Sequence, residues 1–352
     1  MQKQWRVWQV TILRYQVTGV SCKCNIFSQA ELAGKLQTYK ANIWRLEHGD
    51  VVAGEETLVA LSLATNYPPQ FFLQTGEILP VNLSYRKRKN VPAKILTPIE
   101  AHINIIRRHV QLITRSTEQA APQLPQYPVT EKSTPEKIAA TLRQKWNIPA
   151  GPLSNLGKLL EAQNIIISSF DFGTDRVDSR SMLTDDNYPI IFLNRNLQGD
   201  KQRFSLAFEL GHLIMHTFCV VPHDRDISHE ANLFAAEFLM PAKDIIKDFK
   251  DGITLPLLGE LKRKWKASMI ALLYRADDLG LLTPNQKRYL IQQFNDQKIR
   301  RREPPQLDVP PETPRLLPGL FAGFRAKAKL SVSQLCTLLA IEHADYIKYH
   351  YD

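Results

Sequence analysis

The chain is poor in cysteine and has no long hydrophobic run. Its four cysteines in 352 residues are scattered, at Cys22, Cys24, Cys219 and Cys336. Such a pattern does not make the dense disulfide framework of a small secreted domain, which favours a reducing compartment. No apolar run approaches the roughly 20 residues that cross a bilayer. The first residues, Met1–Val20, lack the continuous apolar core of a signal peptide. We therefore expect a cytoplasmic protein with no membrane partner.

Charge is abundant and unequal in sign. Lys and Arg number 45 against 35 Asp and Glu, so the formal net charge is +10. A hydrophobic content of 44% and a charged content of 23% are those of a packed protein rather than a disordered one. The length suits two or three domains. The excess of positive charge favours an anionic partner.

A second absence concerns a metal-binding motif. Zinc peptidases carry H-E-x-x-H on a helix, where two His four residues apart bind Zn and the Glu is the general base. Residues 208–212 read Phe-Glu-Leu-Gly-His, so Glu209 and His212 are present and Phe208 stands where the first His belongs. A benzyl side chain has no lone pair for a metal. We expect the helix that carries this stretch to span Asp200–His216.

The segment from Ser28 to Phe72 predicts short helices joined by tight turns. Ser28 followed by Glu31 is a capping box at a helix start. A second helix is expected over Lys40–His48, stopped by Gly49. Two short helices with a tight turn between them form the helix-turn-helix arrangement.

The same segment resembles the Xre/Cro-type helix-turn-helix domain, through S-Q-x-E-L-A at its start and I-x-R-x-E-x-G later. The resemblance implies that five side chains face DNA: Gln29, Tyr39, Lys40, Asn42 and Arg45. Asn and Gln suit adenine, whereas Lys and Arg suit guanine or phosphate. Gln37 and Trp44 depart from the usual turn Gly and the usual small residue. A helical bundle used only for dimerisation or partner docking therefore stays open.

The rest of the chain alternates helices, short strands and Pro-rich connections. A basic run, Tyr85–Lys89, predicts a solvated loop that could add phosphate contacts. A helix is expected over Thr97–Thr114, followed by a Pro-rich linker at 116–135. Strands are expected at Asn164–Ser168, Ser181–Leu183 and Pro189–Asn194, between helices. No repeat of fixed period is evident.

Three stretches of the second half resemble the ImmA/IrrE family of zinc metallopeptidases: Arg203–His212, Glu230–Pro241 and Ser268–Ala276. The resemblance implies a zincin-like domain of helices with a small sheet. Together with the helix-turn-helix segment, it makes the chain similar to fused Xre-plus-ImmA/IrrE regulators. These are often encoded on mobile elements, and their active relatives cut a repressor.

The predicted fold class is α+β, in four parts. They are an all-α helix-turn-helix domain at 1–74, a basic helical segment and linker at 75–135, a metallopeptidase-like domain at 136–302, and a Pro-rich strap with a short helical C-terminal module at 303–352.

Carried over residue by residue, the resemblance places Glu209 at the general-base position and His212 at the second ligand position. The family's third ligand is a carboxylate on the next helix, where this chain has Ser228. Phe208 and Ser228 thus occupy two of the three ligand positions, and catalytic zinc needs three protein ligands. We expect no zinc unless a displaced set forms around His212. Candidates for that set are His216, His223, His229 and Glu230.

Three functions are compatible with these patterns. The first is a sequence-specific DNA-binding transcriptional regulator whose peptidase-like domain is inactive and senses a signal or binds a partner. The second is a zinc-dependent endopeptidase that cleaves a repressor through Glu209. The third is an antitoxin-like protein-binding adaptor. Expected partners are double-stranded DNA, a repressor or toxin, and a second copy of the chain, because helix-turn-helix proteins commonly bind as dimers.

Overall fold

The computed structural model describes residues 27–48, 50–73, 86–87, 91–117, 120–217, 222 and 224–351. Cys22, Cys24, Cys219 and His223 lie outside these ranges. None of the helices within them combines the length and the apolar composition needed to cross a bilayer.

The N-terminal unit consists of short helices around a small core. They are α2 (Gln29–Lys35), α3 (Lys40–His48), α4 (Glu55–Thr65) and the 3-10 helix η1 (Pro69–Leu73). The expected capping box is present, because the Ser28 side chain accepts from the Glu31 backbone and Glu31 accepts from the Ser28 backbone. Gln37 turns the chain with a φ of 50°, the left-handed conformation that Gly would adopt with less strain. The turn is therefore kept despite the departure from glycine.

Helix α5 (Ala93–Ser116) starts earlier than Pro98 predicts. A Pro inside a helix removes one backbone hydrogen bond and normally ends or kinks the helix. Here the helix continues through it, because one face from Ile99 onward is buried in the core, where it also carries Ile103, Ile106, Val110 and Ile113. Burial of this apolar face outweighs the local cost of the proline.

A four-stranded sheet forms the centre of the molecule, in the order β1-β3-β4-β2. The strands are β1 (Arg86–Lys87), β2 (Ile166–Phe170), β3 (Val177–Leu183) and β4 (Pro189–Asn194). Strand β2 is parallel to β4, whereas β3 is antiparallel to β4 and β1 is antiparallel to β3. The prediction of a loop for the basic run was wrong at Arg86–Lys87, whose backbone pairs with β3. Strand β3 begins at Val177, earlier than the predicted start at Ser181. The prediction missed these first residues because several of them are polar and do not make an apolar run.

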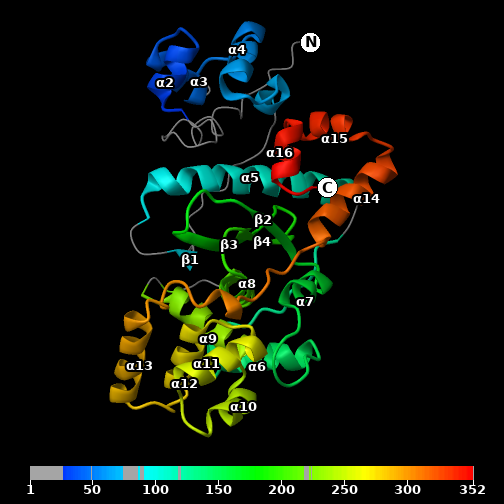
Figure 1. Ribbon diagram of the computed structural model, residues 1–352. Helices are drawn as coiled ribbons and strands as arrows, with labels where there is room; N and C mark the ends of the chain where they lie inside the picture. Colours follow the sequence, from blue (N-terminus) through cyan, green and yellow to red (C-terminus); the bar gives the residue numbers. More distant parts are fainter. Residues whose placement is uncertain are drawn as a thin grey trace.

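Helices cover both faces of the sheet (Figure 1). Alternation along β4 explains this, since Ile190 and Phe192 join one hydrophobic cluster with α5 while Ile191 and Leu193 join another with α8 (Gly199–Met215). The remaining helices on the α8 side are α6 (Pro135–Lys145), α7 (Leu156–Ala162), α9 (Ile227–Leu239), α10 (Ala242–Ile245), η2 (Ile246–Phe249), α11 (Leu255–Trp265), α12 (Met269–Asp278) and α13 (Pro284–Asp296). The predicted α+β class is confirmed, although α13 was not expected.

The C-terminal module packs on α5 (Figure 1). It follows η3 (Pro305–Leu307) and comprises α14 (Leu316–Ala328), α15 (Val332–Leu339) and α16 (His343–Lys348). Two buried His–Tyr hydrogen bonds hold it. His102 Nδ1 lies 2.7 Å from the Tyr349 hydroxyl, and His109 Nδ1 lies 3.0 Å from the Tyr351 hydroxyl. Burial lowers the pKa of both histidines to about 3, so both are neutral at pH 7.

This contact predicts a loss of docking in acid. The unfolded histidine pKa is about 6.5, well above the folded values, so the undocked state binds more protons as the pH falls. The stabilisation is complete above pH 6.5 and is lost progressively toward pH 3. Near-UV circular dichroism of the buried tyrosines should follow this loss. In His102→Gln with His109→Gln the transition should move to lower pH, whereas His343→Gln, at an exposed histidine, should leave it in place. An unmoved transition in the double variant would contradict this account of docking.

Candidate functional site

Helix α8 is buried along nearly its whole length, and only Lys201 and Phe204 are partly exposed. It packs against β3, β4, α7 and α9. Gly211 allows the closest approach, because a Cβ there would meet the Phe234 ring at 3.0 Å. Every polar side chain on α8 must therefore find its partners inside the protein.

Glu209 is bound to the sheet. Its side chain is almost fully buried, and its two carboxylate oxygens accept hydrogen bonds from Ser179 Oγ at 2.8 Å and Ser181 Oγ at 2.7 Å. The two serines are two positions apart on β3, so both hydroxyls point to the same face of the sheet. The residue at the general-base position thus links helix and sheet.

His212 begins a chain of hydrogen bonds that runs to α9. Its Nδ1 lies 2.9 Å from His216 Nδ1, and His216 Nε2 lies 2.9 Å from Glu230 Oε2. Arg225 donates to both oxygens of Glu230, from Nη2 at 2.6 Å. We call His212, His216, Glu230 and Arg225 the α8–α9 relay. Burial lowers the pKa of His212 to about 3, and burial also lowers the pKa of His216.

The relay fixes the tautomers of its neutral histidines. Because a carboxylate only accepts, His216 donates from Nε2 and offers its Nδ1 lone pair to His212. His212 then donates from Nδ1, and its Nε2 carries a lone pair. That Nε2 atom is buried and has no hydrogen-bond partner among the described residues. An imidazole nitrogen with a free lone pair can bind zinc, but this atom supplies only one of the three protein ligands that a catalytic zinc site needs.

Phe208 packs against the ring of His212. Its ring is buried, and the ring centroid lies 4.7 Å from that of His212 in an edge-to-face arrangement. Aromatic rings pack favourably in this way. The side chain therefore adds packing where the motif would supply a second nitrogen donor.

Ser228 and His229 lie apart from the relay. Ser228 is half-buried in the first turn of α9, and its carbonyl accepts from Asn232 Nδ2 at 2.9 Å. His229 is exposed and lines a separate cavity of about 730 Å³ together with Asn232 and Phe204. The α9 side chain that reaches the α8 histidines is Glu230, which Arg225 already holds.

These residues do not fit a catalytic zinc ion. Three protein ligands are required, and the described residues contain no group of three His, Cys, Asp or Glu arranged to hold a metal. His212 and His216 face each other through Nδ1 at hydrogen-bond distance, with no room for an ion between them.

The residues predicted to face DNA lie on α2, on α3 and in the turn between them. Tyr39 is 81% exposed, and Lys40, Asn42 and Arg45 are also exposed on α3. Asn42 Nδ2 donates to Thr38 Oγ1 at 2.8 Å, which orients the amide. Gln29 differs, because it is half-buried and donates to Glu47. Four of the five side chains are thus accessible to a partner.

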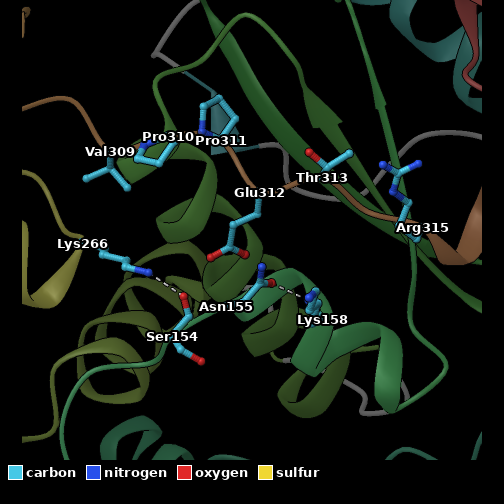
Figure 2. Close-up of a pocket in the computed structure, with 10 residues that line it drawn as sticks. All are labelled: Ser154, Asn155, Lys158, Lys266, Val309, Pro310, Pro311, Glu312, Thr313 and Arg315. Carbon is cyan, nitrogen blue, oxygen red and sulfur yellow. Dashed lines mark hydrogen bonds between the residues drawn. The ribbon is translucent and has the colours of Figure 1, made fainter.

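Sequence reasoning missed two acids of the Pro-rich strap. Glu312 forms an ion pair with buried Arg203 of α8 and accepts from the backbone of Leu156 at 3.1 Å and Gly157 at 2.5 Å. Figure 2 shows Glu312 in the wall of a cavity of about 500 Å³ beside Asn155 and Lys158. The available signal was Arg203 itself, since a charged side chain on a buried helix requires a partner.

The other strap acid is Glu303. It accepts from Lys262 Nζ at 2.6 Å, and the same lysine also binds Asp200 at the start of α8. The strap passes so close to α8 that a Cβ on Gly199 would lie 2.2 Å from the Val309 carbonyl oxygen. The strap thus belongs to the packing around α8.

The model of the family described as Peptidase_M78, IrrE N-terminal-like domain, matches residues 160–277. The matched range contains β2, β3, β4, α8, α9, α11 and most of α12, with Glu209 and His212 inside it. This part of the chain is an IrrE N-terminal-like domain. The curated proteins gave no match to the chain.

The contact between Glu209 and β3 predicts a large stability cost on its removal. A hydrogen bond to a charged group contributes about 1.5–3 kcal/mol, so Ser179→Ala with Ser181→Ala should lower the free energy of unfolding by about 3 kcal/mol or more. Urea unfolding measures this. Ser168→Ala is the matched control, because this buried β2 hydroxyl has no hydrogen-bond partner among the described residues. A double variant no less stable than Ser168→Ala would show that Glu209 does not hold the sheet.

Proposed function

We propose that this chain is a cytoplasmic DNA-binding transcriptional regulator whose IrrE-like domain acts by binding and not by cleavage. The observation that carries the proposal is the exposed face of α3. Asn42 and Arg45, three positions apart, lie on that face, and Lys40 is exposed at the start of the same helix, which a tight turn connects to α2. In helix-turn-helix proteins the second helix enters the major groove, where Asn reads adenine and Arg reads guanine or phosphate.

The state of the peptidase-like helix supports the second half of the proposal. Glu209 is engaged with two serines, and His212 is engaged with His216. Catalysis by a zinc peptidase needs a metal-bound water next to a general base. Side chains committed to hydrogen bonds inside the protein are suited to holding a fixed shape, which a sensing or partner-binding domain requires. A repressor is the class of partner that the family resemblance suggests, whereas a toxin would be the partner in the antitoxin-like alternative.

DNA binding has a direct test. Fluorescence anisotropy of a labelled duplex measures the association constant at several salt concentrations. The logarithm of this constant should fall linearly with the logarithm of the salt concentration, and each phosphate contact should contribute about 0.9 to the slope. Lys40→Ala with Arg45→Ala should weaken binding at low salt and lower the slope by up to about 2. The control is Lys137→Ala with Lys145→Ala, which removes the same charge from exposed positions on α6. Equal binding by both double variants would refute a reading role for α3.

The competing function, a zinc endopeptidase, is favoured by one observation, the bare Nε2 of His212. Metal analysis of the purified full-length chain decides between the two. Our proposal predicts zinc well below one per chain after dialysis, with the same content in His212→Ala. One zinc per chain that disappears in His212→Ala would establish a metal site and overturn the non-catalytic assignment.

A further inference from the structure

The C-terminal module repeats the geometry of the N-terminal helix pair. Ser331 caps α15 as Ser28 caps α2, and both make a capping box. Ser331 Oγ accepts from the Gln334 backbone at 3.2 Å, and Gln334 Oε1 accepts from the Ser331 backbone at 2.8 Å. In the first unit Glu31 stands at the position of Gln334. Ser28 Oγ accepts from the Glu31 backbone at 3.2 Å, and Glu31 Oε2 accepts from the Ser28 backbone at 2.7 Å.

The turn after the first helix is also the same. Ala340 has a φ of 55° where Gln37 has 50°. Backbone hydrogen bonds close both turns, from Ile341 to the Cys336 carbonyl at 3.1 Å and from Thr38 to the Ala33 carbonyl at 2.9 Å. The second helix, α16 or α3, starts three positions after the left-handed residue in each unit.

Burial follows the same order in the two units. At one constant offset in the numbering, the buried residues correspond as Leu32 with Leu335, Ala33 with Cys336 and Ile43 with Tyr346. The exposed positions correspond as Lys40 with His343, Ala41 with Ala344 and Trp44 with Ile347. Helices α15 and α16 therefore form a second helix-turn-helix unit, with α14 preceding them.

A left-handed residue in the turn between two helices does not by itself identify a DNA-binding helix-turn-helix unit. Helices α11 and α12 are also joined by such a turn, at Lys266 with a φ of 52°, followed by the cap residue Ser268. Their second helix is buried in the core through Leu272 and Leu273, and Arg275 is paired with Glu237. The α15–α16 unit differs because the outer face of its second helix is exposed.

The end of α14, just before the α15–α16 unit, carries positive charge. Lys327 and Lys329 are exposed just before α15, and neither makes an ion pair in the described part of the chain. The exposed face of α16 presents His343, Ala344 and Ile347, the last 50% exposed. Small and apolar side chains on such a helix can contact the methyl group of thymine. Figure 1 shows α15 and α16 on the side of α5 away from the sheet, where α2 and α3 also lie.

We propose that the C-terminal module is a second DNA-binding unit, so that one chain holds double-stranded DNA at two places. Lys327 and Lys329 bind phosphates, and the exposed face of α16 lies in a major groove. Exposed Glu342 stands just before α16, where Tyr39 stands before α3, and a carboxylate at a base edge accepts from the amino group of cytosine. The inference rests on the proposed DNA-binding function and assigns it a second surface.

The test compares three double variants of the full-length chain on one probe. The probe is a mixed-sequence duplex of about 40 base pairs, long enough for two sites a helical turn or more apart. Lys327→Ala with Lys329→Ala should lower affinity about tenfold at low salt and lower the salt slope by up to about 2. Lys40→Ala with Arg45→Ala should do the same, and the quadruple variant should lose both contributions. Lys137→Ala with Lys145→Ala remains the control.

The outcomes separate this inference from the function on which it rests. If only the α3 variant weakens binding, the second unit does not bind DNA and the proposed function stands; a protein-docking role for the exposed Leu338 and Ile347 would give this result. If only the Lys327 and Lys329 variant weakens binding, the C-terminal module is the DNA-binding unit and the assignment of α3 is wrong. If neither differs from the control, both proposals fail. All substituted lysines and Arg45 are on the surface, so folding should be unaffected.

Discussion

Burial of nearly the whole of α8 is the constraint on which the rest of the structure depends. A helix packed between a sheet and other helices has no water for its buried polar side chains. Each must be paired within the protein, and each pair ties α8 to another element. Glu209 binds β3, His212 leads to α9, Arg203 binds the strap, and Asp200 meets α11 through Lys262. Glu209 and His212, the two residues of the catalytic motif that are present, therefore connect α8 to neighbouring elements.

The same constraint explains how Phe208 and His216 act together. Phe208 fills space beside His212 without offering a donor, and His216 takes up the Nδ1 hydrogen of His212. Glu230 completes the chain because Arg225 neutralises it from the other side. A buried histidine held in this way is neutral, well oriented and shielded, which suits structural rigidity. The relay therefore joins α8 to α9 inside the IrrE-like domain through a continuous chain of hydrogen bonds.

The sequence allowed much of the fold to be predicted, and physical reasons explain what it did not. The capping box at Ser28, the buried run of β4 and the helix around Glu209 follow from local patterns and were found. Strand β1 at Arg86–Lys87 was not predicted, because two charged residues carry no sequence signal for a strand. They form a strand only through backbone pairing with β3. The relay depends on Glu230 and Arg225 meeting His216 across two helices, which helical spacing alone could not show. A helical C-terminal module was predicted, but its correspondence with α2 and α3 was not, because it lies in caps, turn angle and burial while most side chains differ, as with Ala33 and Cys336 or Ile43 and Tyr346.

His212 is a neutral side chain engaged through Nδ1 in the α8–α9 relay. Nuclear magnetic resonance of the imidazole nitrogens in the full-length protein tests it most directly, with His212→Gln to assign the signals. We expect the Nδ1–H tautomer for His212, with no protonation as the pH falls from 7 to about 5, below the ordinary histidine pKa of about 6.5. An Nε2–H tautomer, or protonation near pH 6.5, would mean that the relay does not exist in solution.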